Sequence, residues 1–293
     1  MANNEKQIAM RVSVVSAAVN IILSVLKLAA GLIAHSGAMV SDAVHSASDV
    51  FSTLVVMIGV HMASKEADEE HPYGHERMEC VAAIVLAVVL FATGAAIGYS
   101  GLERLSDGSG KDLQVPGALA LAAAVVSIAV KEWMYWYTVI AAKKINSGAL
   151  KADAWHHRSD ALSSVGALFG IAGARMGYPF LDSVASVVIC AFVIKAAYDI
   201  FRDAIDKMLD TACDKDTVGK LRKIIENQSG VLGISKLTTR IFGSKIYVDV
   251  EIEADGSIPL KEAHDIAENV HYAIEQGVGD VKHCMVHVNP KRV

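Results

Sequence analysis

Long runs of apolar residues, separated by short polar connections, fill the first two thirds of the chain. A helix that crosses a bilayer needs about 20 predominantly apolar residues. Six segments meet this length: residues 12–34, 38–64, 78–102, 115–142, 149–176 and 180–205. Glycine, proline and charged residues occupy the connections, as in the Gly-Tyr-Pro sequence at 177–179. The pattern therefore predicts an α-helical membrane bundle of six transmembrane helices within residues 1–208.

The pattern changes from residue 209 onward, where polar residues become frequent. Apolar positions recur at helical spacing in residues 216–227 and 257–276, and they alternate as in strands in residues 231–241, 245–253 and 281–288. This order predicts a small αββαβ domain of the α+β class in residues 209–293. A domain of this size has a limited core, so pairing with a second copy would help to stabilise it.

Composition and charge agree with a membrane protein and exclude some partners. Hydrophobic residues make up 53% of the chain, and the mean hydropathy is +0.38, which is high for a soluble protein of this size. The net charge of −5 comes without any basic tract, which argues against nucleic acid as a partner. The 4 cysteines are scattered and form no CxxC pair, so no disulfide framework is expected.

Lysine and arginine flank the six apolar segments unevenly. The side that holds the N-terminus carries nine of them, including Lys143 and Lys144, and the other side carries Arg104, Lys111 and Arg175. Cytoplasmic loops are enriched in these residues. We therefore expect a multi-pass protein of the cell (inner) membrane with both termini in the cytoplasm.

One short pattern, D-A-x-H-x-x-x-D, occurs in the second apolar segment and again in the fifth. The six matching residues are Asp42, His45 and Asp49, then Asp153, His156 and Asp160. At about 100° per residue, positions i, i+3 and i+7 of a helix lie within roughly 60° of one another. Each copy thus places two carboxylates and an imidazole on one helical face, and ionisable residues inside membrane segments mark functional sites. The two segments cross in opposite directions, as in an inverted repeat.

If the two segments touch, their histidine–aspartate pairs can form one metal site. The four ligands would be His45, Asp49, His156 and Asp160. Two imidazoles and two carboxylates suit tetrahedral Zn²⁺, and two carboxylates cancel the charge of a divalent ion. A single buried pair would more often be a packing contact between helices, but its repetition favours a metal site.

Three further residues near the repeated motif are expected to support the ligands. Asp42 and Asp153 share the ligand face but lie nearer the segment ends, where they can orient the histidines. His157 is turned about 100° from His156 on a helix, which makes it the weaker ligand candidate.

These features together resemble the cation diffusion facilitator family of divalent-metal transporters. The resemblance is carried by the two HxxxD pairs, the loop sequence HPYGHER at residues 71–77, and six apolar segments followed by a polar domain. It implies metal/proton antiport by alternating access, a homodimer and a ferredoxin-like cytoplasmic domain for dimerisation and metal sensing. It also places the transport site on the four predicted ligands, which are His45, Asp49, His156 and Asp160.

The resemblance implies further metal sites outside the repeated motif. A loop site would use Asp68, His71 and His75, although Glu76 stands where the family usually has glycine. A regulatory zinc site in the cytoplasmic domain would draw on Asp249, His264, His283 and His287, with Cys284 as a further candidate. His283 and Cys284 are adjacent in a strand, so they are expected on opposite faces of the sheet.

The sequence thus predicts a secondary active transporter that exports divalent cations, with Zn²⁺ as the expected cargo and no organic cofactor. Fe²⁺, Cd²⁺, Co²⁺ and Mn²⁺ remain alternatives, because ligand type alone does not decide metal selectivity. A membrane metal sensor is a rival interpretation. A metalloenzyme would need an open coordination position and a general base, and no HExxH motif is present.

Overall fold

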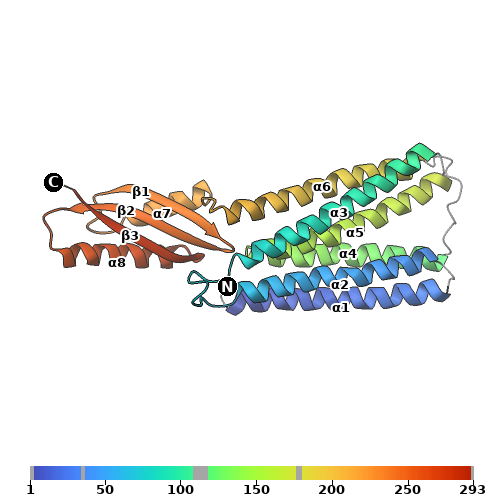
Figure 1. The fold of residues 1–293 in the computed structure, drawn as a ribbon, viewed down its shortest axis with the longest axis horizontal. Coiled ribbons are helices and arrows are strands. Elements are labelled where there is room, and N and C mark those ends of the chain that lie inside the picture. The colour runs from blue at the N-terminus through green and yellow to red at the C-terminus, as the bar shows by residue number, and fades with distance from the viewer. Residues whose placement is uncertain (1–2, 34–36, 108–117, 176–179, 292–293) are drawn as a thin grey trace. The chain divides into compact units, whose positions relative to one another are not determined.

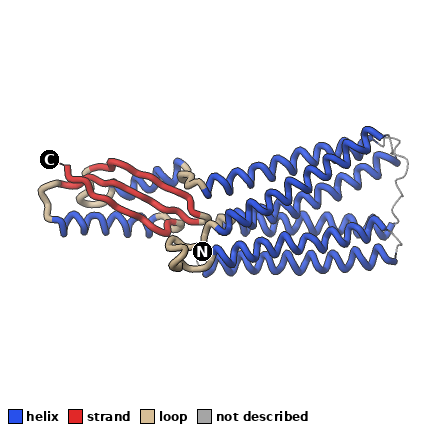
Figure 2. Tube along the Cα trace, in the orientation of Figure 1, coloured by secondary structure: helices blue, strands red, loops and turns tan. Residues whose placement is uncertain are grey.

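The computed structural model describes residues 3–33, 37–107, 118–175 and 180–291 (Figure 1). Within the helices, the side chains of some residues, among them 38–48 and 166–175, are not described. The chain divides into two compact units, Met1–Ile205 and Asp206–Val293. The first unit is helical, and the second combines helices with a sheet (Figure 2).

Six long helices make up the described part of the first unit, and each covers most of one of the predicted apolar segments. They are α1 (Asn3–Ile33), α2 (Gly37–Ala63), α3 (Met78–Asp107), α4 (Ala118–Lys144), α5 (Gly148–Arg175) and α6 (Phe180–Met208). Each has 27 to 31 residues, enough to cross a hydrocarbon core about 30 Å thick. Among the described residues, Asn4–Ala29 and Met78–Glu103 also meet a stringent test of length and apolar composition.

This bundle buries several polar residues beside its apolar core and exposes many large apolar residues. Helix α1 packs against α2 and α4, α5 packs against α2, α3 and α4, and α2 also contacts α3. Ser13, Ser16 and Asn20 of α1 are buried, whereas Ile33 is 74% exposed and Phe51 of α2 is 73% exposed. An apolar outer surface around buried polar groups is typical of helices that face lipid.

The second unit has the predicted αββαβ order. Its elements are α7 (Lys215–Glu226), β1 (Gly233–Phe242), β2 (Lys245–Asp255), α8 (Leu260–Gly277) and β3 (Val281–Lys291). The sheet order is β1-β2-β3, with β1 and β2 antiparallel and β2 and β3 parallel. Helix α8 connects the parallel strands and packs against β3. The small α+β domain predicted from the alternating pattern is confirmed.

Alternation along β2 separates the two faces of this sheet. Val248, Val250 and Ile252 are buried in a core that also contains Leu221 of α7 and Ile274 of α8. Helix α8 begins later than expected, because the side chain of Asp255 accepts a hydrogen bond from the Ser257 N–H at 2.9 Å and holds a turn before the helix.

Candidate metal centre

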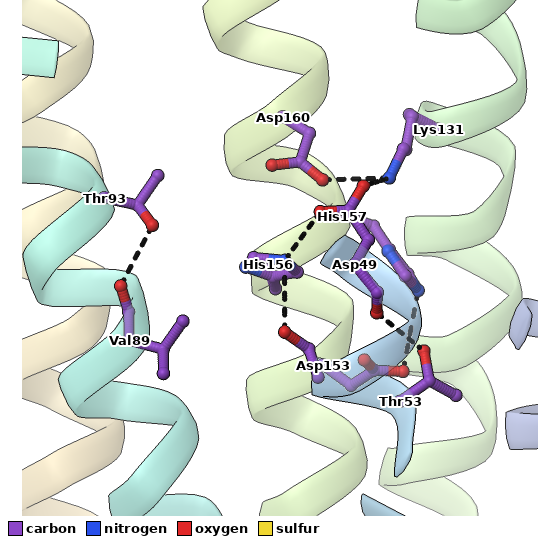
Figure 3. Close-up of polar contacts among 10 residues, drawn as sticks. Asp49, Thr53, Val89, Thr93, Lys131, Asp153, His156, His157 and Asp160 are labelled. Atoms are coloured by element: carbon purple, nitrogen blue, oxygen red, sulfur yellow. Dashed lines mark hydrogen bonds and ion pairs between the residues drawn. The ribbon is translucent and has the colours of Figure 1, made fainter. Parts of the chain in front are cut away.

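Helices α2 and α5 bring three of the predicted ligands together inside the bundle. Asp49 of α2 and His156 and Asp160 of α5 each offer a ligand atom, and these atoms lie within 4.8 Å of one another. The three residues are 2%, 5% and 7% exposed. His156 and Asp160 are one helical turn apart, so both side chains leave α5 on the same face (Figure 3).

The contacts between the two helices run through His156. Its Nε2 lies 3.3 Å from Asp49 Oδ1 and 3.4 Å from Ser52 Oγ. The expected contact between the second and fifth helices is therefore present. The side chains of His45 and Asp42, which the sequence also assigns to this site, lie outside the described residues.

Lys131 of α4 is a member of this cluster that the sequence analysis did not assign to the site. Its ammonium donates hydrogen bonds to Asp49 Oδ2 at 2.5 Å and to Asp160 Oδ2 at 2.9 Å (Figure 3). The sequence did contain a signal, because a charged residue in the middle of an apolar segment requires a polar partner. It could not identify the partner, since no pattern links α4 to the repeated motif.

Asp153 and His157 form a separate buried pair on α5. Both are 0% exposed, and His157 Nε2 lies 3.5 Å from Asp153 Oδ2. They do not belong to the three-residue group around His156. Asp153 contacts His157 and not the ligand His156 in this structure, so the supporting role of both residues stays a prediction.

The loop between α2 and α3 gathers the three residues predicted for a second metal site. Asp68 Oδ1 accepts a hydrogen bond from the His71 N–H at 2.8 Å, and Asp68 Oδ2 lies 3.4 Å from His75 Nε2. The two imidazole rings are 4.4 Å apart between centroids. The Lys65 ammonium, together with the His71 backbone N–H, holds the pKa of Asp68 well below its usual range, so this carboxylate stays charged near neutral pH.

The residues predicted for a cytoplasmic metal site are not gathered in one chain. Asp249, His264, His283 and His287 are all exposed, the first on β2, the second on α8 and the last two on β3. No group of three potential metal ligands occurs among the described residues of the second unit. The prediction that His283 and Cys284 lie on opposite faces of the sheet is confirmed, because Cys284 is buried in the core whereas His283 is exposed.

Burial gives Cys284 a testable pH dependence. Desolvation, with nearby Glu275 and Asp249, raises the pKa of its thiol to about 12. The thiolate is the form that binds metals and reacts with alkylating reagents, and it is absent at neutral pH. We expect Cys284 to resist iodoacetamide at pH 8 in the folded protein and to react in denaturant, as peptide mass spectrometry would show. Rapid modification in the folded state would contradict this assignment.

Comparisons with known proteins place this geometry in a family. Residues 13–209 match the Cation efflux transmembrane domain, and residues 213–291 match the Cation efflux protein, cytoplasmic domain. An uncharacterized transporter of Methanocaldococcus jannaschii is 36% identical over 270 residues, which cover 92% of this chain and 94% of the relative. The manganese efflux system protein MneP of Bacillus subtilis is 28% identical over 297 residues, 99% of both chains.

A solved structure titled MamM-CTD 215-293 resembles part of the chain, with 23% identity and a TM-score of 0.26, over 26% of this chain and 98% of that one. The match to the transmembrane family covers more than half of the chain, and the cytoplasmic match covers nearly all of the remainder. The chain therefore belongs to the cation efflux family of membrane transporters, also called cation diffusion facilitators, which export divalent metal ions.

Proposed function

We propose that this protein exports Zn²⁺ in exchange for protons and that the buried cluster of Asp49, His156 and Asp160 is its transport site. The observation that carries the proposal is the convergence of these three side chains from α2 and α5 within 4.8 Å. His45 lies one turn before Asp49 on α2 and would supply the fourth ligand. Two imidazoles and two carboxylates would then complete a tetrahedral site.

Charge and burial support the exchange of metal for protons. The Lys131 ammonium balances only one of the two negative charges that ionised Asp49 and Asp160 carry, and an unbalanced buried charge is costly. A divalent ion or protons can each neutralise this charge. Because both bind the same side chains, a bound metal ion excludes the protons, and bound protons exclude the metal ion. Alternate opening of the bundle to either side of the membrane would turn this exclusion into antiport.

Manganese is the second candidate cargo. Two relatives, 28% and 31% identical to this chain, are named as manganese efflux proteins. Imidazole ligands favour zinc, whereas carboxylate and water oxygens favour manganese. We expect proteoliposomes with this protein to take up Zn²⁺ at low micromolar concentration and to be inhibited only weakly by equal Mn²⁺. Faster Mn²⁺ uptake that zinc does not suppress would assign manganese as the cargo.

The loop and the cytoplasmic domain are proposed as regulatory parts. Asp68, His71 and His75 would bind a second metal ion, and the cytoplasmic domain would pair two chains into a homodimer. Asp249, His264, His283 and His287 are exposed within one chain, so any regulatory zinc site built from them would need ligands from a second copy. The protein would lie in the cell (inner) membrane with both termini in the cytoplasm.

The loop site can be tested separately from transport. Asp68→Asn removes the carboxylate that contacts both loop histidines. We expect one fewer bound zinc per chain by equilibrium dialysis, with metal flux at saturating zinc largely retained. Asp265→Asn, an exposed change on α8, is the matched control. Unchanged zinc stoichiometry in Asp68→Asn would contradict the loop site.

A further inference from the structure

The Lys131 ammonium contacts both carboxylates that would hold the metal ion, Asp49 and Asp160. Its Nζ is within hydrogen-bond distance of one oxygen of each carboxylate, and its side chain is 3% exposed. A divalent ion bound by both carboxylates must also contact an oxygen of each. The ammonium and the ion would therefore share the same two carboxylates, among α2, α4 and α5.

Charge makes it costly for both cations to remain there. The ionised carboxylates of Asp49 and Asp160 carry two negative charges, and the Lys131 ammonium carries one positive charge. A divalent ion added beside the ammonium would leave a net positive charge in a buried site, which is unfavourable. If the ammonium withdraws, the two positive charges of the ion balance the two negative charges of the carboxylates. The four-carbon stem of lysine is flexible, so the ammonium can change position while its Cα stays in α4.

We propose that Lys131 is a tethered cation that competes with the transported metal for Asp49 and Asp160 and so determines which ions the site accepts. This inference rests on the proposed transport site. A monovalent ion such as Na⁺ would replace one unit of charge by another and gain little, whereas a divalent ion brings an additional charge. Lys131 thus excludes monovalent cations and weakens divalent binding enough for release.

Zinc binding to the full-length protein in detergent tests this role. The background is His71→Ala/His75→Ala, which removes the loop site from the calorimetric signal; zinc bound by the cytoplasmic domain is recognised as the part of the signal that Asp49→Asn leaves in place. We expect Lys131→Met to bind Zn²⁺ roughly tenfold more tightly, since coupling between two ligands is typically about 5–150-fold. Replacing choline chloride by sodium chloride should weaken zinc binding by Lys131→Met only. Lys131→Arg keeps the charge and should restore insensitivity to sodium.

Transport kinetics provide a second measure. Lys131→Met should show a lower KM for zinc and a lower kcat, because tighter binding slows release. A protein in which Lys131 merely positions the two carboxylates would show the opposite change in KM. An unchanged or higher Kd for zinc in Lys131→Met would overturn the inference.

Thermal unfolding keeps the test decisive if the variant folds poorly. Lys131→Met leaves two carboxylates facing one another, so we expect a lower Tm without zinc and recovery of the wild-type Tm at saturating zinc. Instability that zinc does not relieve would overturn the inference. The proposed transport site is tested separately. If it is wrong, Asp49→Asn binds zinc as tightly as the wild type does.

Discussion

Asp49→Asn should reduce zinc flux to the level of liposomes without protein. Asp49 is the α2 residue that contacts both His156 and Lys131. An amide keeps the shape of the side chain but removes the negative charge that the metal ion requires. Loss of groups that only orient metal ligands typically costs about 10–100-fold in affinity or activity, so loss of a ligand should cost more. Radioactive zinc uptake into proteoliposomes measures the effect.

A matched control separates the loss of a ligand from a general loss of carboxylates. Glu69→Gln makes the same chemical change at an exposed position in the loop after α2 and should transport at the wild-type rate. Size-exclusion chromatography of both variants checks that they remain folded. Wild-type flux in Asp49→Asn would show that the repeated motif is structural.

Gly59→Leu should disrupt the bundle and strongly reduce the yield of folded protein. Helices α2 and α3 approach so closely that a Cβ at Gly59 would lie 2.4 Å from Ala82 Cβ. Small residues permit such close contact between membrane helices, and a leucine would force the two helices apart. Overpacking typically costs about 1–3 kcal/mol, and a clash between two Cβ atoms, which no rotamer change can relieve, is expected near or above the upper end. The fraction of monodisperse protein in detergent measures this effect.

Gly148→Ala is the control for this substitution. A Cβ at Gly148 would lie 3.6 Å from Ala83 Cβ, an ordinary contact distance. We expect this variant to be recovered at the wild-type yield. Equal yields for Gly59→Leu and the wild type would mean that the close approach of α2 and α3 is not needed for folding.

Residue periodicity was sufficient to predict most of the architecture. Apolar length predicted the six long helices, and alternation predicted strand β2, in which Val248, Val250 and Ile252 are buried. Helix ends were less accurate. Helix α1 begins at Asn3, whereas the predicted apolar segment begins at residue 12. The first turns of this helix are polar, so apolar length alone could not predict them.

The candidate site was predictable only in part. The repeated motif identified Asp49, His156 and Asp160, because residues four apart share a helical face and the two copies signal a common role. Lys131 belongs to no repeat, and its contact with Asp160 depends on how α4 packs against α5. The pairing of Asp153 with His157 likewise follows from helical spacing, but its complete burial depends on neighbouring helices.

The central claim is best tested by recording zinc and proton movement together in proteoliposomes that contain the wild-type protein. Fluorescent indicators for zinc and for pH would be enclosed in the same vesicles, and zinc would be added outside under an imposed pH gradient. We expect zinc uptake coupled to proton movement in the opposite direction, with both signals lost in Asp49→Asn. Zinc binding without flux, or flux that is independent of Asp49, would contradict it.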